Sequence, residues 1–193
     1  MPVREMLLPQ VRTRMRRMGH SHEKLHLADG SKVIVRAIRL EDGPKLQAFV
    51  RKLSARSRYF RFFAGVVELS AAQTDRLLRL DPDRGLALVA LNDQEPESIV
   101  AEARCVLDRE GGSAEFAIAV ADEFQRRRLG TRLVKRLLAY ALAKGVRRLF
   151  GEIIAENHGM LAFVRRLGFR LRSNPSDATT LIAQRVAIDP LAE

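Results

Sequence analysis

The chain has 193 residues and a net charge of +11, which suggests one domain with a short extra segment and an affinity for polyanions or phosphate-rich ligands. Its composition, 47% apolar and 30% charged, excludes a disordered or fibrous protein, and the single Cys105 excludes an intrachain disulfide or a four-cysteine zinc site. No apolar run is long enough to cross a bilayer and no secretory leader is evident, so we expect a cytoplasmic protein without membrane contact.

Residues 1–30 differ from the rest, and we predict that they form a basic arm beside a globular domain of residues 31–193. The stretch RTRMRRMGHSHEKLH is rich in arginine and has no continuous apolar stripe. It contains three of the four histidines, His20, His22 and His26. These side chains could bind a metal ion, but no cysteine framework accompanies them, so we predict a solvated stretch and no metal site.

The domain is predicted to alternate strands with helices, which indicates an α/β fold with a mixed sheet. Runs of β-branched residues between turn residues predict strands, and apolar residues at a spacing of three to four predict helices. We expect strands at KVIVRAI (32–38), GLALVALN (85–92), SIVAEARCVLD (98–108), SAEFAIAV (113–120), RRLFGEIIA (147–155), FRLR (169–172) and ATTLIAQRVAI (178–188). We expect helices at 41–53, 57–63, 69–81, 129–144 and 157–168, the third capped by Ser70.

The strand SAEFAIAV leads through ADEFQRRRLGT directly into the amphipathic helix 129–144. A helix N-terminus presents unpaired N–H groups and a partial positive charge, so a strand that leads into it aims these donors at an anion. Arg126, Arg127 and Arg128 add cations at the same place. Taken alone, this turn reads more readily as a solvated basic loop, and the decision depends on motifs further along the chain.

Those motifs are Asn157 and the LGF of residues 167–169, with which the chain resembles the GNAT family of acyl-CoA-dependent N-acetyltransferases. The shared pattern is a strand, then Q/R-x-x-G-x-G/A opening a helix, then a second strand, then N and LGF, within about residues 32–188. The chain most resembles the acetyltransferase domain of Pat-type protein lysine acetyltransferases, through SRYFRFF (57–63), residues 69–91, AEFAIAV, FQRRRLGTRLV and GEIIAENHGML. The resemblance implies a GNAT fold, with a mostly antiparallel sheet of about seven strands flanked by helices.

The resemblance also implies acetyl-CoA as the cofactor, and no metal. The diphosphate is expected at the turn formed by Gln125, Arg126, Arg127, Arg128, Leu129, Gly130 and Thr131. The pantetheine arm is expected to pair with the backbone of Ile118, Ala119 and Val120, and Asn157 to contact the CoA arm while it caps the last helix. Arg128 departs from the family, which usually has glycine there. Its amide can still donate unless φ is positive, and its guanidinium can reach a phosphate.

Glu115 is the predicted general base. A lysine amine with a pKa near 10.4 is almost fully protonated at pH 7, so a base assists its attack on a thioester. Alternation along SAEFAIAV puts Glu115 on one face with Ala117 and Ala119, which leaves room for a substrate. Without the resemblance, which implies a glutamate base here, a solvent-facing glutamate is the plainer interpretation. Glu102 and Glu152 are alternatives, although each is expected to pair with an arginine.

The general acid of many GNAT enzymes is missing, because Val164 occupies the place of the tyrosine that protonates the leaving thiolate. CoA can leave as a thiolate that water protonates, so this absence does not exclude catalysis. We expect Tyr140 and Cys105 to pack in the interior.

Three functions agree with these features. The first is a protein lysine acetyltransferase that works through a ternary complex, with a partner that exposes a lysine, such as an acyl-CoA synthetase. The second is an acetyltransferase for a small-molecule amine. The third is a basic module that senses CoA or binds nucleic acid without turnover, against which Glu115 and the shortage of aromatic residues argue. We predict the first, because SRYFRFF and AEFAIAV match the lysine-acetylating subgroup.

Overall fold

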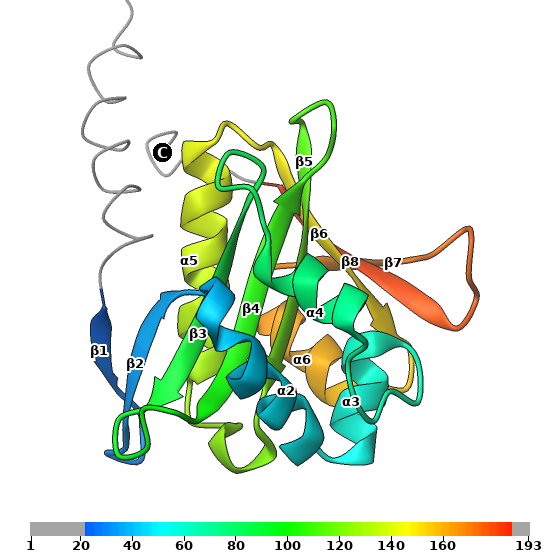
Figure 1. Cartoon of the computed structure of the whole chain (residues 1–193). Helices are drawn as coiled ribbons and strands as arrows, with labels where there is room; N and C mark the ends of the chain where they lie inside the picture. The colour runs from blue at the N-terminus through cyan, green and yellow to red at the C-terminus, as the bar shows by residue number, and fades with distance from the viewer. Residues whose placement is uncertain (1–21, 187–193) are drawn as a thin grey trace, which may run out of the picture.

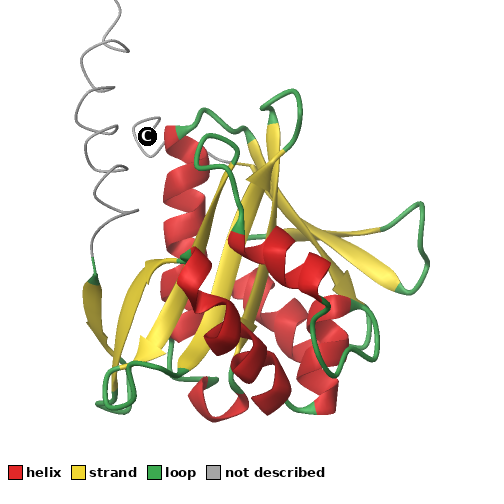
Figure 2. Cartoon of the chain, in the orientation of Figure 1, coloured by secondary structure: helices red, strands yellow, loops and turns green. Residues whose placement is uncertain are grey.

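The computed structural model describes residues 22–186, which form one eight-stranded sheet flanked by helices (Figures 1 and 2). The strands are β1 (Glu23–His26), β2 (Lys32–Ala37), β3 (Gly85–Asn92), β4 (Ile99–Leu107), β5 (Ser113–Val120), β6 (Arg148–Ile154), β7 (Arg170–Ser173) and β8 (Thr180–Val186). The helices are α2 (Gly43–Lys52), α3 (Ala55–Phe62), α4 (Ala71–Leu78), α5 (Leu129–Ala143) and α6 (His158–Arg166), with 3-10 turns η2 (Leu40–Asp42) and η3 (Asp122–Phe124).

The strand order is β1-β2-β3-β4-β5-β6-β8-β7, and only the β5–β6 pair is parallel. The prediction of a mixed, mostly antiparallel α/β sheet is therefore confirmed, with eight strands in the described chain where about seven were expected. Figure 1 shows α2, α3 and α4 over one face of the sheet and α5 and α6 over the other.

The additional strand, β1, lies inside the segment 1–30 that was predicted as an arm. It pairs with β2 from Glu23 opposite Val35 to His26 opposite Lys32. Leu25 on this strand is only 5% exposed, so the strand belongs to the hydrophobic core. The sheet thus begins before residue 31, and residues 1–21 of the predicted arm lie outside the described residues.

A buried ion pair sets the start of α2 against the end of β2. The guanidinium of Arg36 donates two hydrogen bonds of 2.6 Å to the carboxylate of Asp42, and the Arg39 amide donates a third, of 2.8 Å, to the same carboxylate. Burial raises the pKa of Asp42, but these donors outweigh it, and the pKa stays below its usual range. The pair anchors the first helix on the face of the sheet that carries Glu115.

Helix caps follow the sequence closely. Ser70 accepts a hydrogen bond from the Gln73 amide and the Gln73 side chain accepts one from the Ser70 amide, so the predicted cap of α4 is confirmed. Helix α5 buries the predicted apolar stripe, including Leu133 and Leu137, which are both 0% exposed. Its first turn therefore has a fixed position at the end of β5.

The structure bears only in part on the expectations about membrane contact and about the histidine cluster. None of the helices within residues 22–186 has the length and apolarity needed to cross a bilayer. The cytoplasmic location remains a prediction. Of the three clustered histidines, His20 lies outside the described residues, and the Nε2 atom of His22 lies 2.9 Å from the guanidinium of Arg39.

Candidate active site

Strands β5 and β6 are paired over only a short length. Their parallel register runs from Ser113 opposite Arg148 to Glu115 opposite Phe150. Strand β5 stays paired with β4 as far as Val120, which lies opposite Ala101. Within residues 22–186, the segment 116–120 therefore has no strand partner on the β6 side, and an open edge of sheet begins directly after Glu115.

The direction of the β5 backbone decides which groups face this open edge. The Ala121 amide donates to the Val100 carbonyl of β4, so with the period of two along a strand Ala119 also faces β4. Ile118 and Val120 face the other way. The Val120 carbonyl accepts a 3.1 Å hydrogen bond from the Gln125 side chain, which leaves the N–H and C=O of Ile118 and the N–H of Val120 toward the gap. Of the three residues predicted to pair with an extended ligand, Ala119 is thus turned away.

The predicted diphosphate turn has a left-handed backbone at two arginines. Arg126 has φ +60° and Arg128 has φ +66°, values that favour glycine. Arg128 is the N-cap of α5, and its side chain makes no cap hydrogen bond. The first amides of α5 are therefore left for another acceptor. Arg128 thus has the positive φ under which its own amide was not expected to donate, and this left-handed conformation costs about 1–2 kcal/mol.

The three arginines of this turn have different roles. Arg127 forms a 2.6 Å ion pair with Asp29, and its guanidinium lies 4.8 Å from the centre of the Phe124 ring. Its carbonyl accepts a hydrogen bond from the Ala28 amide. Arg127 therefore holds the turn against the segment between β1 and β2, whereas the side chains of Arg126 and Arg128 are exposed. All three arginines lie in the predicted turn, and their contact with a diphosphate stays a prediction.

Gly130 lies next to β5 and α6, and Asn157 lies at the N-terminus of α6. A Cβ atom at Gly130 would stand 3.5 Å from Cζ of Phe163 on α6 and 3.7 Å from Cδ1 of Ile118. Asn157 accepts a 3.1 Å hydrogen bond from the Met160 amide, which confirms its predicted role as the cap of α6. Leu129, by contrast, is 1% exposed, so that only its backbone is available to a ligand.

The carboxylate of Glu115 lies on the opposite face of the sheet, which α3 covers. The register places Glu115 opposite Val106 and Ala119 opposite Glu102, so these side chains share one face. Desolvation raises the pKa of Glu115, the charge of Glu152 raises it further, and the charge of Arg61 opposes both. Glu115 remains accessible to solvent. A carboxylate with a raised pKa is a better proton acceptor near neutral pH than an ordinary glutamate.

Glu102 is occupied by two arginines. It is 3% exposed and accepts hydrogen bonds of 2.5 Å from Arg104 Nε and 3.0 Å from Arg61 Nη2. Burial raises the pKa of Glu102, but the two guanidinium groups outweigh it and hold the pKa below its usual range. Glu102 pairs with arginines, as expected from the sequence, and through Arg61 it anchors α3, so it is a poor base. Arg61, the second arginine of SRYFRFF, is a partner that the sequence analysis did not identify.

The other residues considered for a chemical role are buried. Val164, at the place of the family tyrosine, is 0% exposed. The hydroxyl of Tyr140 donates to the Pro82 carbonyl, and burial raises its pKa. Burial also raises the pKa of the Cys105 thiol to about 12, which makes it inert as a nucleophile.

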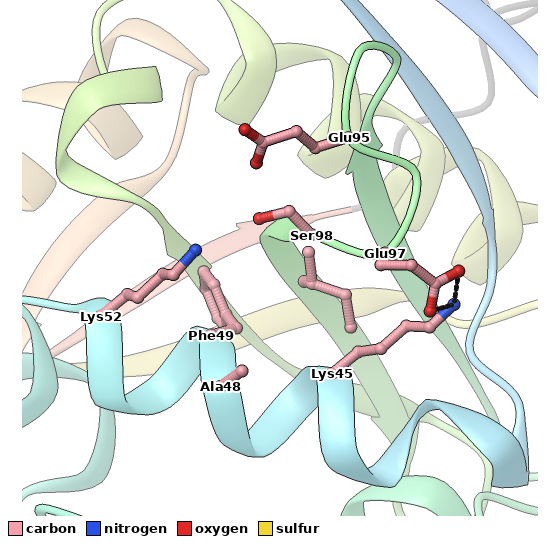
Figure 3. A pocket seen from close by; sticks show the side chains of 8 residues that line it. Lys45, Ala48, Phe49, Lys52, Glu95, Glu97 and Ser98 are labelled. Atoms are coloured by element: carbon pink, nitrogen blue, oxygen red, sulfur yellow. Dashed lines mark hydrogen bonds and ion pairs between the residues drawn. The ribbon is translucent and has the colours of Figure 1, made fainter.

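A cavity of about 340 Å³ lies between α2 and the turn that joins β3 to β4 (Figure 3). Its lining consists of Lys45, Ala48, Phe49, Lys52, Glu95, Glu97, Ser98 and Ile99. None of the predicted site residues is among them. Ile99 is the first residue of β4, whereas Val106, the partner of Glu115, lies near its other end. The cavity therefore lies away from Glu115, at the other end of β4.

Comparisons with known proteins agree with this arrangement. Residues 49–169 match the model that describes the Acetyltransferase (GNAT) family. The chain is 32% identical over 157 residues to an acetyltransferase of Pseudomonas aeruginosa, which covers 81% of this chain and 84% of that protein. The fold is similar to the GNAT domain of S. lividans PAT, with a TM-score of 0.78 and 25% identity over 86% of this chain and 97% of that one. It is also similar to a phosphinothricin acetyltransferase from Sinorhizobium meliloti in complex with AcCoA, with a TM-score of 0.65 and 17% identity over 83% and 94% of the two chains.

Proposed function

The chain belongs to the GNAT family of acetyltransferases, and we propose that it transfers an acetyl group from acetyl-CoA to the side-chain amine of a lysine on another protein. The general activity, that of an acyl-CoA-dependent N-acetyltransferase, follows from the family, whereas the identity of the acceptor is our proposal. The observation that carries the proposal is the position of Glu115. It is the last residue of β5 that pairs with β6, so its carboxylate stands where the open edge begins.

The residues around the open edge fit acetyl-CoA. Bound acetyl-CoA supplies an acetyl group activated as a thioester. The backbone groups of Ile118 and Val120 that face the gap can pair with the amides of the pantetheine arm. The first amides of α5, with the exposed Arg126 and Arg128, suit the diphosphate. Because Gly130 has no side chain, space remains between the start of α5 and the side chains of Ile118 and Phe163.

Glu115 is the base that we propose for the acceptor amine. Removing the proton from a free lysine at pH 7 costs about 4.6 kcal/mol, so a proton acceptor at the reaction centre contributes strongly to the rate. Its raised pKa and its accessibility to solvent allow it to accept the proton directly or through water. The small side chains of Ala117 and Ala119 on the same face leave room for the acceptor.

Several features support a protein as the acceptor. The similarity to the GNAT domain of S. lividans PAT and the SRYFRFF motif both point to the lysine-acetylating subgroup. Tyr59 and Phe63, of that motif, are 44% and 43% exposed on α3 and at its end, and exposed aromatic side chains suit a protein surface. The charge of +11 disfavours free polyamines. We propose an acyl-CoA synthetase as the partner.

A small amine is the second candidate acceptor. The register of β5 and β6 places Glu152 on the same face as Glu115, and its charge raises the pKa of Glu115. Such a pair would attract a small cation as well as the ammonium of a lysine side chain.

A panel assay separates the two acceptors. Labelled acetyl-CoA is incubated with the protein and, in turn, a folded acyl-CoA synthetase, spermidine and free lysine, each at two salt concentrations. We expect the synthetase to be acetylated with the highest kcat/KM, less so at the higher salt, and Glu115→Gln to remove the signal. A higher kcat/KM for spermidine or lysine would replace the protein acceptor with a small amine and leave the cofactor assignment intact.

A further inference from the structure

Asp122 connects two parts of the molecule that are far apart in sequence. It is the first residue of η3, which directly follows β5, and its carboxylate accepts three hydrogen bonds from the start of α3. The Ser54 amide donates at 3.0 Å, the Ser54 hydroxyl at 3.0 Å and the Ser57 hydroxyl at 2.7 Å. Burial raises the pKa of Asp122, but these donors outweigh it and hold the pKa below its usual range. The connection is therefore between an ionised carboxylate and three donors.

These contacts complete the N-terminus of α3. Ser54 is the N-cap of the helix, and its hydroxyl accepts a hydrogen bond from the Ser57 amide. A carboxylate beside the first turn of a helix is also favoured by the helix dipole. The junction between α2 and α3 is held from the other side by Arg58, which donates to the carbonyls of Arg51 and Leu53. The position of α3 thus depends on where Asp122 stands.

The other end of α3 lies at the reaction centre. Arg61, two turns after Ser54, forms the ion pair with Glu102 and opposes the raised pKa of Glu115. A shift of α3 along its axis would move Arg61 with it, because a helix moves largely as a rigid body. Contacts at Ser54 therefore bear on the surroundings of the base.

The same turn shapes the cofactor loop. The Gln125 amide donates to the Asp122 carbonyl at 3.3 Å, and the Gln125 side chain donates to the Val120 carbonyl at 3.1 Å. Asp122 thus belongs at once to the loop that leads to Arg126 and Arg128 and to the cap of α3.

We propose that Asp122 is a positioning residue that couples the turn 125–131, where acetyl-CoA is expected to bind, to helix α3. Cofactor binding at the start of α5 would then order α3, which covers the face of the sheet where the acceptor amine meets Glu115. The inference rests on the proposed function, because it requires acetyl-CoA at the open edge of β5. The carboxylate of Asp122 is thus the group through which cofactor binding affects α3, on the opposite face of the sheet. By linkage, an acceptor that orders α3 strengthens acetyl-CoA binding by the same factor.

Hydrogen exchange of the α3 amides tests the coupling without knowledge of the acceptor. Acetyl-CoA binding to the full chain is first measured by calorimetry, and exchange in residues 55–62 is then followed with and without saturating acetyl-CoA. We expect acetyl-CoA to slow exchange in α3 about fivefold or more, the lower end of typical coupling between sites. In Asp122→Ala the slowing should be confined to residues 121–131, and Ser57→Ala, which removes one bond of three, should give an intermediate result.

Asp177→Ala is the matched control, because Asp177 accepts hydrogen bonds from Thr179 in the turn between β7 and β8 and bonds neither to α3 nor to residues 121–131. It should keep the protection of α3. Protection of α3 that persists in both Asp122→Ala and Ser57→Ala, or that is absent from the wild-type complex, overturns the proposal. A wild-type chain that binds no acetyl-CoA in calorimetry overturns the proposed function itself.

Discussion

The carbonyl oxygen of Phe116 lies so close to Gly151 that a Cβ atom at Gly151 would stand 2.8 Å from it. The same Cβ would stand 2.9 Å from Cε1 of the Phe116 ring. The contact falls just beyond the last paired residues of β5 and β6, Glu115 and Phe150. The two strands are therefore in tight contact at the point where their pairing ends, with no room for a side chain at Gly151.

We expect Gly151→Ala to push β6 away from β5. Overpacking of a tight contact typically costs about 1–3 kcal/mol, so the free energy of unfolding should fall by that amount and acetyl-CoA binding should weaken. Thermal unfolding and calorimetry measure the two effects. Gly159→Ala on α6 is the control, since its Cβ would meet no atom closer than 3.9 Å and alanine favours a helix. A Gly151→Ala protein as stable as the wild type would show that β6 adapts freely.

Glu115→Gln should lower activity and raise stability together. Turnover should fall by about 10²–10⁴, the usual loss for a general base, with little change in acetyl-CoA affinity. Because the pKa of Glu115 is raised on folding, its contribution to stability is present below its unfolded pKa and is lost as the pH rises through the folded pKa. The variant should therefore unfold at a higher temperature than the wild type at pH 7, and at the same temperature below about pH 4.

The control for Glu115→Gln is Glu110→Gln, in the exposed turn between β4 and β5. It should change neither turnover nor thermal stability. A Glu115→Gln protein with wild-type turnover at pH 7 would transfer the role of base to Glu152.

The sequence predicts the long periodic elements well, because each carries its own pattern. Strand Ser113–Val120 and helix Leu129–Ala143 have nearly the predicted bounds. The four-residue β1 is not predictable in this way, because Leu25 is its only buried apolar side chain and its stability comes from pairing with β2.

Features of the site that depend on residues distant in sequence could not be predicted from the sequence either. Nothing in the run RRR separates Arg127 from its neighbours, since its ion-pair partner Asp29 lies far away in the sequence. The open edge of β5 likewise depends on where β6 stops pairing, which is a property of the register and not of the β5 sequence. The family resemblance locates Glu115, but its raised pKa comes first from burial in the fold and then from the charge of Glu152 on the next strand.

Arg61→Met should shift the pH dependence of the reaction. Arg61 lowers the pKa of Glu115, so its removal raises that pKa, and a larger fraction of Glu115 is protonated at a given pH. The acidic limb of the pH–rate profile should therefore move to higher pH. The variant also leaves Glu102 with only Arg104, and breaking a buried pair can cost about 3–5 kcal/mol, so rates are compared at a temperature where the variant stays folded. Arg61→Lys, which keeps the charge, should return the acidic limb to nearly its wild-type pH. If the limb does not move in Arg61→Met, then Arg61 does not influence the pKa of the base.

A series at Gly130 tests the diphosphate turn. Gly130→Ala places a methyl group in ordinary contact with Phe163 and Ile118, so it should fold normally and bind acetyl-CoA with a small loss. Gly130→Asn adds bulk, and Gly130→Asp adds the same bulk with a negative charge that repels the diphosphate. We expect affinity in calorimetry to fall from Ala to Asn, and binding to be abolished in Asp. Equal affinity for the Asn and Asp variants would mean that no phosphate lies near this residue.

Arg128→Gly should have opposite effects on stability and on cofactor binding. Glycine adopts the left-handed conformation at φ +66° without the strain that arginine bears there, so the free energy of unfolding should rise by about 1 kcal/mol, or about 2–4 °C in Tm for a chain of this length. The loss of an exposed cation at the start of α5 should weaken acetyl-CoA binding and make it less sensitive to salt. Arg128→Lys keeps the charge and the strain, so it should leave Tm unchanged and retain most of the affinity. If Arg128→Gly gains stability and binds acetyl-CoA as tightly as the wild type at low salt, then the arginine does not reach the phosphates and only the shape of the turn matters.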